Sequence, residues 1–178
     1  MNLGVDVFSS CVTPQHLQPG IGLRPGGGRP DVEALIPALF AALYDSIAAH
    51  SRHGFDEVVD VAHHDGYSRP LAVLADCARR LAGLPSLFVG VRCPIDVITR
   101  RRDATWPGWR VGLALADTPH GELPEVVLRW ESHVHAHAYD LEVDTAALTP
   151  AECADQIRRR LDGGPRGSAL QRLASGRA

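Results

Sequence analysis

The sequence contains no lysine, because all 18 basic residues in its 178-residue length are arginine. The chain therefore cannot form a Schiff base on a lysine side chain, and it cannot complete a Walker A loop, whose lysine reaches the nucleotide phosphates. Cysteine is also scarce: the four cysteines are far apart, and none belongs to a CxxC pair. This usage argues against a disulfide scaffold or a cysteine zinc site, and it leads us to expect a cytoplasmic location.

Long apolar runs and excess positive charge are missing as well. No continuous apolar run approaches the ~20 residues of a membrane-spanning helix, and the N-terminal residues MNLGVDVFSSC do not resemble a signal peptide. The net charge of −3 argues against a general nucleic-acid binder. Hydrophobic residues make up 45% of the chain and charged residues 22%, which predicts a packed core. We expect a single domain over residues 1–162 and a flexible tail over 163–178.

Short β-branched segments alternate with amphipathic ones along the chain. The predicted strands cover residues 3–8, 57–62, 86–91 and 139–143. The predicted helices cover residues 32–50, 71–81, 94–102, 122–138 and 150–161. This alternation predicts an α/β fold, a three-layer sandwich in which helices cover both faces of a parallel sheet. Ligands of such sheets bind beyond the carboxyl ends of the strands.

Polar side chains at predicted strand ends are the first candidates for chemistry. Asp6 ends the first strand and Asp60 lies in the second. Carboxylates at such positions can bind Mg²⁺ or accept a proton from an attacking hydroxyl, whereas the alternative is a helix cap or a solvated loop acid. His63, His64 and Asp65 follow the second strand directly and are candidates for a substrate pocket.

Arginines cluster around a turn rich in proline, glycine and tryptophan. Guanidinium groups match phosphate oxygens, so Arg101, Arg102 and Arg110 are candidates for phosphate binding, and a solvated helix end is the alternative. Histidines alternate later in the chain, and His133 and His137 would share one face of a helix. That spacing leaves a zinc hydrolase open as an alternative, but no glutamate stands between the two, and we predict no metal site made by the protein alone.

The segments LGVDVF, PGIGLRPGG, VVDVAHHDGYSR, LFVGVRCP and YDLEVDT with TPAECADQI follow one another from about Leu3 to Leu161. Together they resemble the chloramphenicol phosphotransferase-like family of small P-loop kinases. The resemblance implies a P-loop NTPase-like fold and transfer of a phosphoryl group from ATP, with Mg²⁺, to a hydroxyl of a small molecule. For the best-known activity of the family that molecule is chloramphenicol, and the result is antibiotic resistance.

The resemblance also implies roles for particular residues. Asp6 corresponds to the base at the acceptor hydroxyl, and Asp60 to the acid that assists Mg²⁺. Arg101 or Arg102, together with Arg110, correspond to the arginines that contact phosphates.

The front of the chain departs from the family pattern. Family members place a strand, a GxxxxGK[ST] loop and a helix before the GVD strand, whereas this sequence starts at GVD. Because that loop cradles the nucleotide, we expect this chain to be a truncated kinase that is weakly active or inactive as it stands. The alternative is a non-catalytic module that binds a small ligand. We further expect a vacant strand position between residues 57–62 and 86–91.

Overall fold

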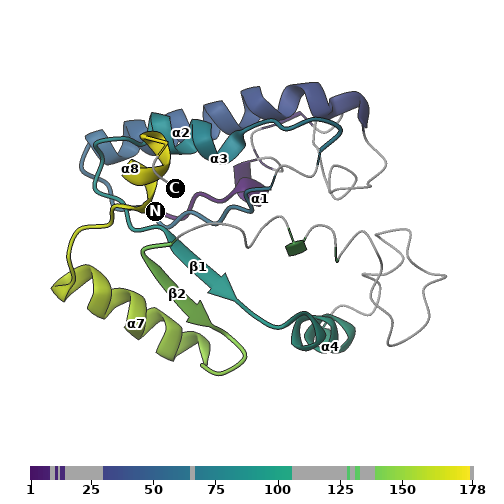
Figure 1. The fold of residues 1–178 in the computed structure, drawn as a ribbon, viewed down its shortest axis with the longest axis vertical. Helices are drawn as coiled ribbons and strands as arrows, with labels where there is room; N and C mark the ends of the chain where they lie inside the picture. The colour runs from purple at the N-terminus through teal and green to yellow at the C-terminus, as the bar shows by residue number, and fades with distance from the viewer. Residues whose placement is uncertain are drawn as a thin grey trace.

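The structure is a computed structural model that describes residues 1–8, 11, 13–14, 30–64, 67–105, 128, 131–132 and 139–176. The described elements are α1 (Val5–Val7), the 3-10 helix η4 (Pro30–Leu35), α2 (Ile36–Arg52), α3 (Val73–Arg80), β1 (Val89–Arg92), α4 (Ile95–Thr105), β2 (Leu141–Asp144), α7 (Pro150–Gly163) and α8 (Ala169–Ala174). Figure 1 shows α2, α3 and α8 together on one side, with β1, β2 and α7 on the other. The predicted helix over 122–138 lies largely outside the described residues.

The strands β1 and β2 pair in parallel, in a register that matches Val89 with Leu141 and Arg92 with Asp144. Parallel pairing is what the alternating sequence predicts. Helix α7 packs on β2, and Val143 is buried. This helix begins with a capping box, because the Thr149 side chain accepts from the backbone N–H of Glu152 while the Glu152 carboxylate accepts from the Thr149 N–H.

A second parallel pair forms at the N-terminus. Asn2 bridges Val58 in parallel, the Leu3 N–H donates to the Val58 carbonyl at 3.0 Å, and the Val5 N–H donates to the Asp60 carbonyl at 2.9 Å. The predicted strand over 3–8 is wrong beyond its first residues, because the chain turns into α1, where the Phe8 N–H donates to the Gly4 carbonyl at 2.9 Å.

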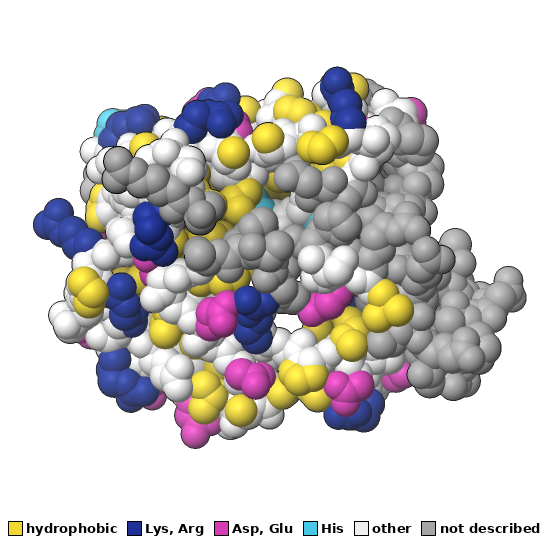
Figure 2. All heavy atoms as spheres, viewed as in Figure 1, with side chains coloured by type: hydrophobic (Ala, Val, Ile, Leu, Met, Phe, Trp, Pro, Cys, Tyr) yellow, Lys and Arg dark blue, Asp and Glu magenta, His cyan; other side chains and the backbone are white. Residues whose placement is uncertain are grey.

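The two parallel pairs are separate among the described residues. The sheet there contains β1 and β2 alone, and no described backbone hydrogen bond joins residues 57–62 to β1. Figure 2 shows the surface hollowed between the part built on α2 and α3 and the part built on β1 and β2. Helices and a small parallel sheet agree with an α/β chain, whereas the three-layer sandwich stays a prediction.

The core lies mainly between α2, α3 and α8. Its buried side chains are Ile36, Phe40, Leu43, Tyr44, Ile47, Ala48, Val73, Leu74, Cys77, Ala78, Leu81 and Leu170. On α2 these residues recur every three or four positions, which places them on one face of the helix. Pro37 stands in the first turn of α2, where its missing N–H would have no partner inside the helix. The predicted helix is therefore confirmed, although its first residues form η4.

Helix Glu33–Arg52 is long and apolar enough to cross a membrane by length and composition alone. The segment contains no uninterrupted apolar run of that length, because polar residues such as Tyr44, Asp45 and Ser46 interrupt it. A core helix of a folded domain passes the same test, and the buried face of α2 lies in the core cluster.

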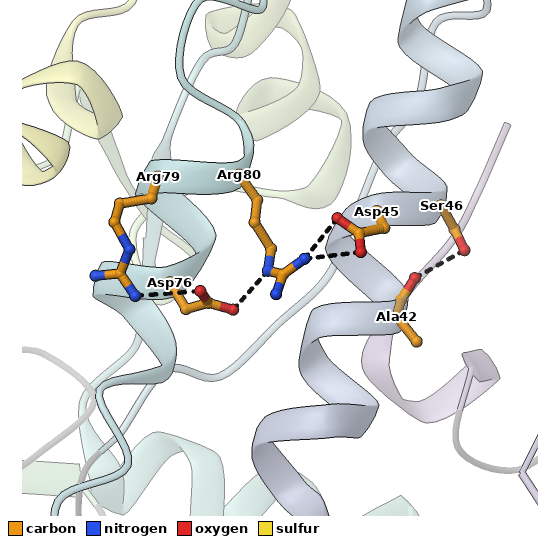
Figure 3. Close-up of polar contacts among 6 residues, drawn as sticks. All are labelled: Ala42, Asp45, Ser46, Asp76, Arg79 and Arg80. Atoms are coloured by element: carbon orange, nitrogen blue, oxygen red, sulfur yellow. Dashed lines mark hydrogen bonds and ion pairs between the residues drawn. The ribbon is translucent and has the colours of Figure 1, made fainter.

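An ion-pair network joins α2 to α3 (Figure 3). Arg80 Nη1 lies 2.7 Å from both carboxylate oxygens of Asp45, and Arg80 Nε lies 2.7 Å from Asp76 Oδ2. Arg79 Nη2 donates to the other oxygen of Asp76 at 3.1 Å. These side chains are partly exposed, so water and salt screen the ion pairs and each contributes little to stability. The network fixes how the two helices face each other rather than supplying much of the stability.

The C-terminal segment contains α8, which packs against α3. Ala169 and Leu170 are buried, and the Asp140 carboxylate accepts from the N–H groups of Ser168 and Ala169 at 2.8 and 2.9 Å. Its other oxygen accepts from the Phe88 N–H at 3.0 Å, so one side chain holds the start of α8 to the chain before β1. The expected flexible tail thus contains a packed helix, while the domain over 1–162 stays a prediction.

Candidate functional site

Asp6 and Asp60 lie at the carboxyl end of the N-terminal strand pair. Asp60 accepts the backbone hydrogen bond of Val5, so it stands beside Gly4, two residues before Asp6. Both aspartate side chains are exposed, whereas Gly4 is buried. The parallel pairing therefore brings together two acids that are far apart in the sequence, at the end of the strands where ligands of α/β folds bind.

The two predicted pocket histidines are buried, with His63 4% and His64 7% exposed. His63 Nε2 lies 2.9 Å from the hydroxyl of Tyr44, and the His63 ring also contacts the rings of Phe40 and Phe88. His64 stacks on Tyr67 with the ring centroids 4.5 Å apart. Their contact with a substrate stays a prediction, but His63 has the surroundings of a core histidine. Asp65 lies outside the described residues.

Tyr44 and Cys77 form a buried polar group with His63 that sequence reasoning missed. Burial raises the pKa of the Tyr44 phenol far above its usual range, and it raises the pKa of the Cys77 thiol to about 12. Tyr44 and Cys77 also share a hydrogen bond, and both therefore stay protonated near neutral pH. A signal was present in the sequence, because Tyr44 stands on the apolar face of its helix, four residues after Phe40, and a buried tyrosine hydroxyl needs a partner.

Arg101 on α4 is engaged by the carboxyl end of β2. Its Nη2 donates to the Thr145 carbonyl at 2.6 Å and its Nη1 to the Thr145 hydroxyl at 3.3 Å. The same hydroxyl donates to the Arg92 carbonyl at 3.1 Å. Arg101 thus holds α4 to the ends of both strands, while Arg102 on the same helix is half-buried. Arg110 lies outside the described residues, and phosphate binding by the three arginines stays a prediction.

Glu33 joins the end of the proline- and glycine-rich segment to the loop before α3. Its carboxylate oxygens each accept from the Ser68 N–H at 3.1 Å, and the Ser68 hydroxyl donates to the same group. These hydrogen bonds lower the pKa of Glu33. No sequence motif pointed to this contact, because it joins residues that are distant in the sequence.

A family model described as chloramphenicol phosphotransferase-like protein matches residues 1–162. The chain belongs to this family. No curated protein and no solved structure matches the chain. Membership in the chloramphenicol phosphotransferase-like family confirms the resemblance seen in the sequence and indicates a phosphotransferase of the kinase type.

The family implies a bound Mg²⁺ ion and a bound nucleotide. The described residues offer one ligand for the ion but only part of a site for the nucleotide. No group of three or more His, Cys, Asp or Glu side chains that could hold a metal ion occurs in the part of the chain that the structure describes. Asp60 fits Mg²⁺ as a single carboxylate ligand, because it is exposed and takes no side-chain hydrogen bond from a described residue. Arg102 fits a phosphate as a cation on α4, but the sequence contains no GxxxxGK[ST] loop to cradle a triphosphate.

Proposed function

We propose that the chain is a phosphotransferase of the kinase type, which moves the terminal phosphoryl group of ATP to a hydroxyl of a small molecule and is weakly active or inactive without a GxxxxGK[ST] loop to cradle the nucleotide. The observation that carries the proposal is the position of Asp6. Asp6 is exposed and directly follows the first parallel strand pair, in which the Val5 N–H donates to the Asp60 carbonyl, in a chain that matches the chloramphenicol phosphotransferase-like family over residues 1–162.

Asp6 serves in this proposal as the general base. As the acceptor oxygen forms its bond to phosphorus, the hydroxyl proton passes to the Asp6 carboxylate, and the bond from phosphorus to the leaving oxygen breaks. A positioned base of this kind contributes a factor of about 10²–10⁴ to a rate. The residue is exposed, so a hydroxylated molecule that arrives from solution can reach its carboxylate.

In this proposal Asp60 and the arginines act on the phosphates of the nucleotide and on the Mg²⁺ bound to them. Bound Mg²⁺ would neutralise charge on the phosphates, and Asp60 would supply one oxygen ligand to it. Arg102, with Arg110 outside the described residues, would bind phosphate oxygens. Arg101 contributes by holding α4 at the carboxyl ends of β1 and β2 through Thr145.

The decisive experiment replaces Asp6 by alanine in the protein expressed from its own gene, with any in-frame upstream DNA included. Transfer of labelled phosphate from ATP to a panel of small hydroxylated molecules, chloramphenicol among them, should fall at least a hundredfold, while calorimetric binding of Mg-ATP stays unchanged. Asp162→Ala, which removes the same charge from an exposed position at the end of α7, is the matched control and should leave transfer intact.

Two results would contradict the proposal. Undiminished transfer by Asp6→Ala would remove this residue from the mechanism. If the protein binds a small hydroxylated ligand but no Mg-ATP, the chain is a ligand-binding module rather than a kinase.

A further inference from the structure

Gly4 lies in a backbone conformation that does not require glycine. Its φ of −103° and ψ of 167° belong to the extended region that every residue type adopts readily. It is nevertheless buried, between the first strand and the turn of α1. The reason for a glycine at this position must therefore lie in its surroundings rather than in its own torsion angles.

The Asp60 carboxylate occupies the space where a side chain at position 4 would be. A Cβ built on Gly4 would lie 2.7 Å from Asp60 Oδ2 and closer still to Asp60 Oδ1 and Cγ. Real Cβ atoms essentially never come within 3.0 Å of another heavy atom in this way. The carboxylate thus lies flat across the neighbouring strand, over the bare Cα of Gly4.

The Asp60 carboxylate is held by the space that Gly4 leaves open rather than by hydrogen bonds. The backbone of Asp60 is fixed by the hydrogen bond from Val5, and the preceding pair is fixed by the hydrogen bond from Leu3 to Val58. By contrast, no described residue forms a side-chain hydrogen bond or an ion pair with the Asp60 carboxylate. The oxygens are therefore placed at the carboxyl end of the strand pair without being neutralised there.

We propose that Gly4 is a positioning residue, whose missing side chain directs the Asp60 carboxylate across the first strand and presents its oxygens to a divalent cation at the carboxyl end of this strand pair. The proposal rests on the proposed function, in which Asp60 assists Mg²⁺. To that proposed function it adds Gly4, a residue that touches neither substrate nor cation and acts only through Asp60.

Replacing Gly4 by alanine separates this role from a structural one. The aspartate side chain is short and can rotate away from the new methyl group, and alanine is compatible with the backbone at position 4. The melting temperature should therefore stay the same or rise slightly, because alanine has fewer unfolded conformations to lose than glycine. Gly163→Ala is the matched control, since a Cβ there would meet no atom within 4 Å.

Manganese serves as a paramagnetic probe for the cation. Titration of the wild-type protein with Mn²⁺ should broaden the backbone amide NMR signals of Gly4, Asp6 and Asp60 before others. In Gly4→Ala the concentration needed should rise at least tenfold, as it should in Asp60→Ala, whereas Gly163→Ala should match the wild type. The double variant Gly4→Ala/Asp60→Ala should behave like Asp60→Ala alone, because Gly4 acts only through that carboxylate.

Several outcomes would overturn the proposal. A wild-type protein without selective broadening has no cation at Asp60, and additive effects in the double variant would show that Gly4 acts by another route. A crystal structure of Gly4→Ala in which the Asp60 carboxylate has not moved would also refute it. If Mn²⁺ binding weakens in Gly4→Ala as expected but no phosphoryl transfer occurs, the role of Gly4 is supported while the proposed kinase activity is contradicted, so the two failures are distinguishable.

Discussion

Replacing Tyr44 by phenylalanine should destabilise the protein through His63 rather than through packing. The two side chains are 1% and 4% exposed, and the tyrosine hydroxyl lies 2.9 Å from His63 Nε2. Phenylalanine fills almost the same volume as tyrosine, so no cavity opens in the core. What is lost is the hydroxyl, and a buried ring nitrogen of His63 then loses its partner.

The size of the stability loss in Tyr44→Phe follows from this unpaired ring nitrogen. A buried polar atom left without a partner costs about 1–3 kcal/mol, which is more than the net gain of an ordinary hydrogen bond. A domain of this size typically has about 5–15 kcal/mol of total stability, so the loss is a substantial fraction of it. Each kcal/mol corresponds to a fall of roughly 2–4 °C in melting temperature for a chain of this length.

Urea unfolding of the wild type, Tyr44→Phe, His63→Phe and the double variant measures the effect. The free energy of unfolding should fall in Tyr44→Phe with an unchanged denaturant slope, and the double variant should lose less than the sum of the two single losses. The reason is that removing both partners of the Tyr44–His63 hydrogen bond leaves neither of these two groups unsatisfied. A loss below about 0.5 kcal/mol in Tyr44→Phe, or strictly additive losses, would refute the assignment of His63 as a core histidine held by Tyr44.

Two further predictions test the packing around this core. Arg80→Ala should lower the melting temperature slightly, through loss of its ion pairs with Asp45 and Asp76. In 1 M NaCl most of that difference should vanish, and a loss independent of salt would show that the Arg80 stem acts by packing instead. Because the pKa of Cys77 is raised to about 12 from 9.0, the folded state keeps its proton where the unfolded state releases it, so stability should fall as pH rises above 9.0. At pH 8 iodoacetamide should modify exposed Cys11 readily and Cys77 only after unfolding, and equal rates in the native protein would contradict the burial.

Local sequence signals predicted several elements with nearly correct bounds. The capping residues Thr149 and Glu152 are adjacent in sequence to the helix they begin, so α7 could be predicted from its first turn. Gly83, with a φ of 82°, lies three residues after the last residue of α3, and glycine is the residue type that adopts a positive φ most readily. In each case the residues that decide the conformation lie within a few positions of it.

The candidate site was predicted residue by residue but not as an arrangement. Asp6 and Asp60 were chosen because each follows or lies in an apolar segment, and the strand pairing places them at one edge. Sequence alone made Arg101 one of three candidates for phosphate binding, which stays a prediction, and it did not predict that the Arg101 guanidinium contacts Thr145. The partner of a long side chain depends on which segments pack together, and that information is not local.

The sequence by itself determined the class of elements, the start of α7, the absence of a lysine-containing phosphate loop and, through its ordered motifs, the family. Those properties depend on neighbouring residues or on residue types alone. Only the tertiary structure decided that His63 is buried against Tyr44, that α8 packs into the core, and that the Asp60 carboxylate lies over Gly4. These are contacts between segments distant in the chain, and they arise because burial of apolar surface brings together side chains whose meeting no local pattern encodes.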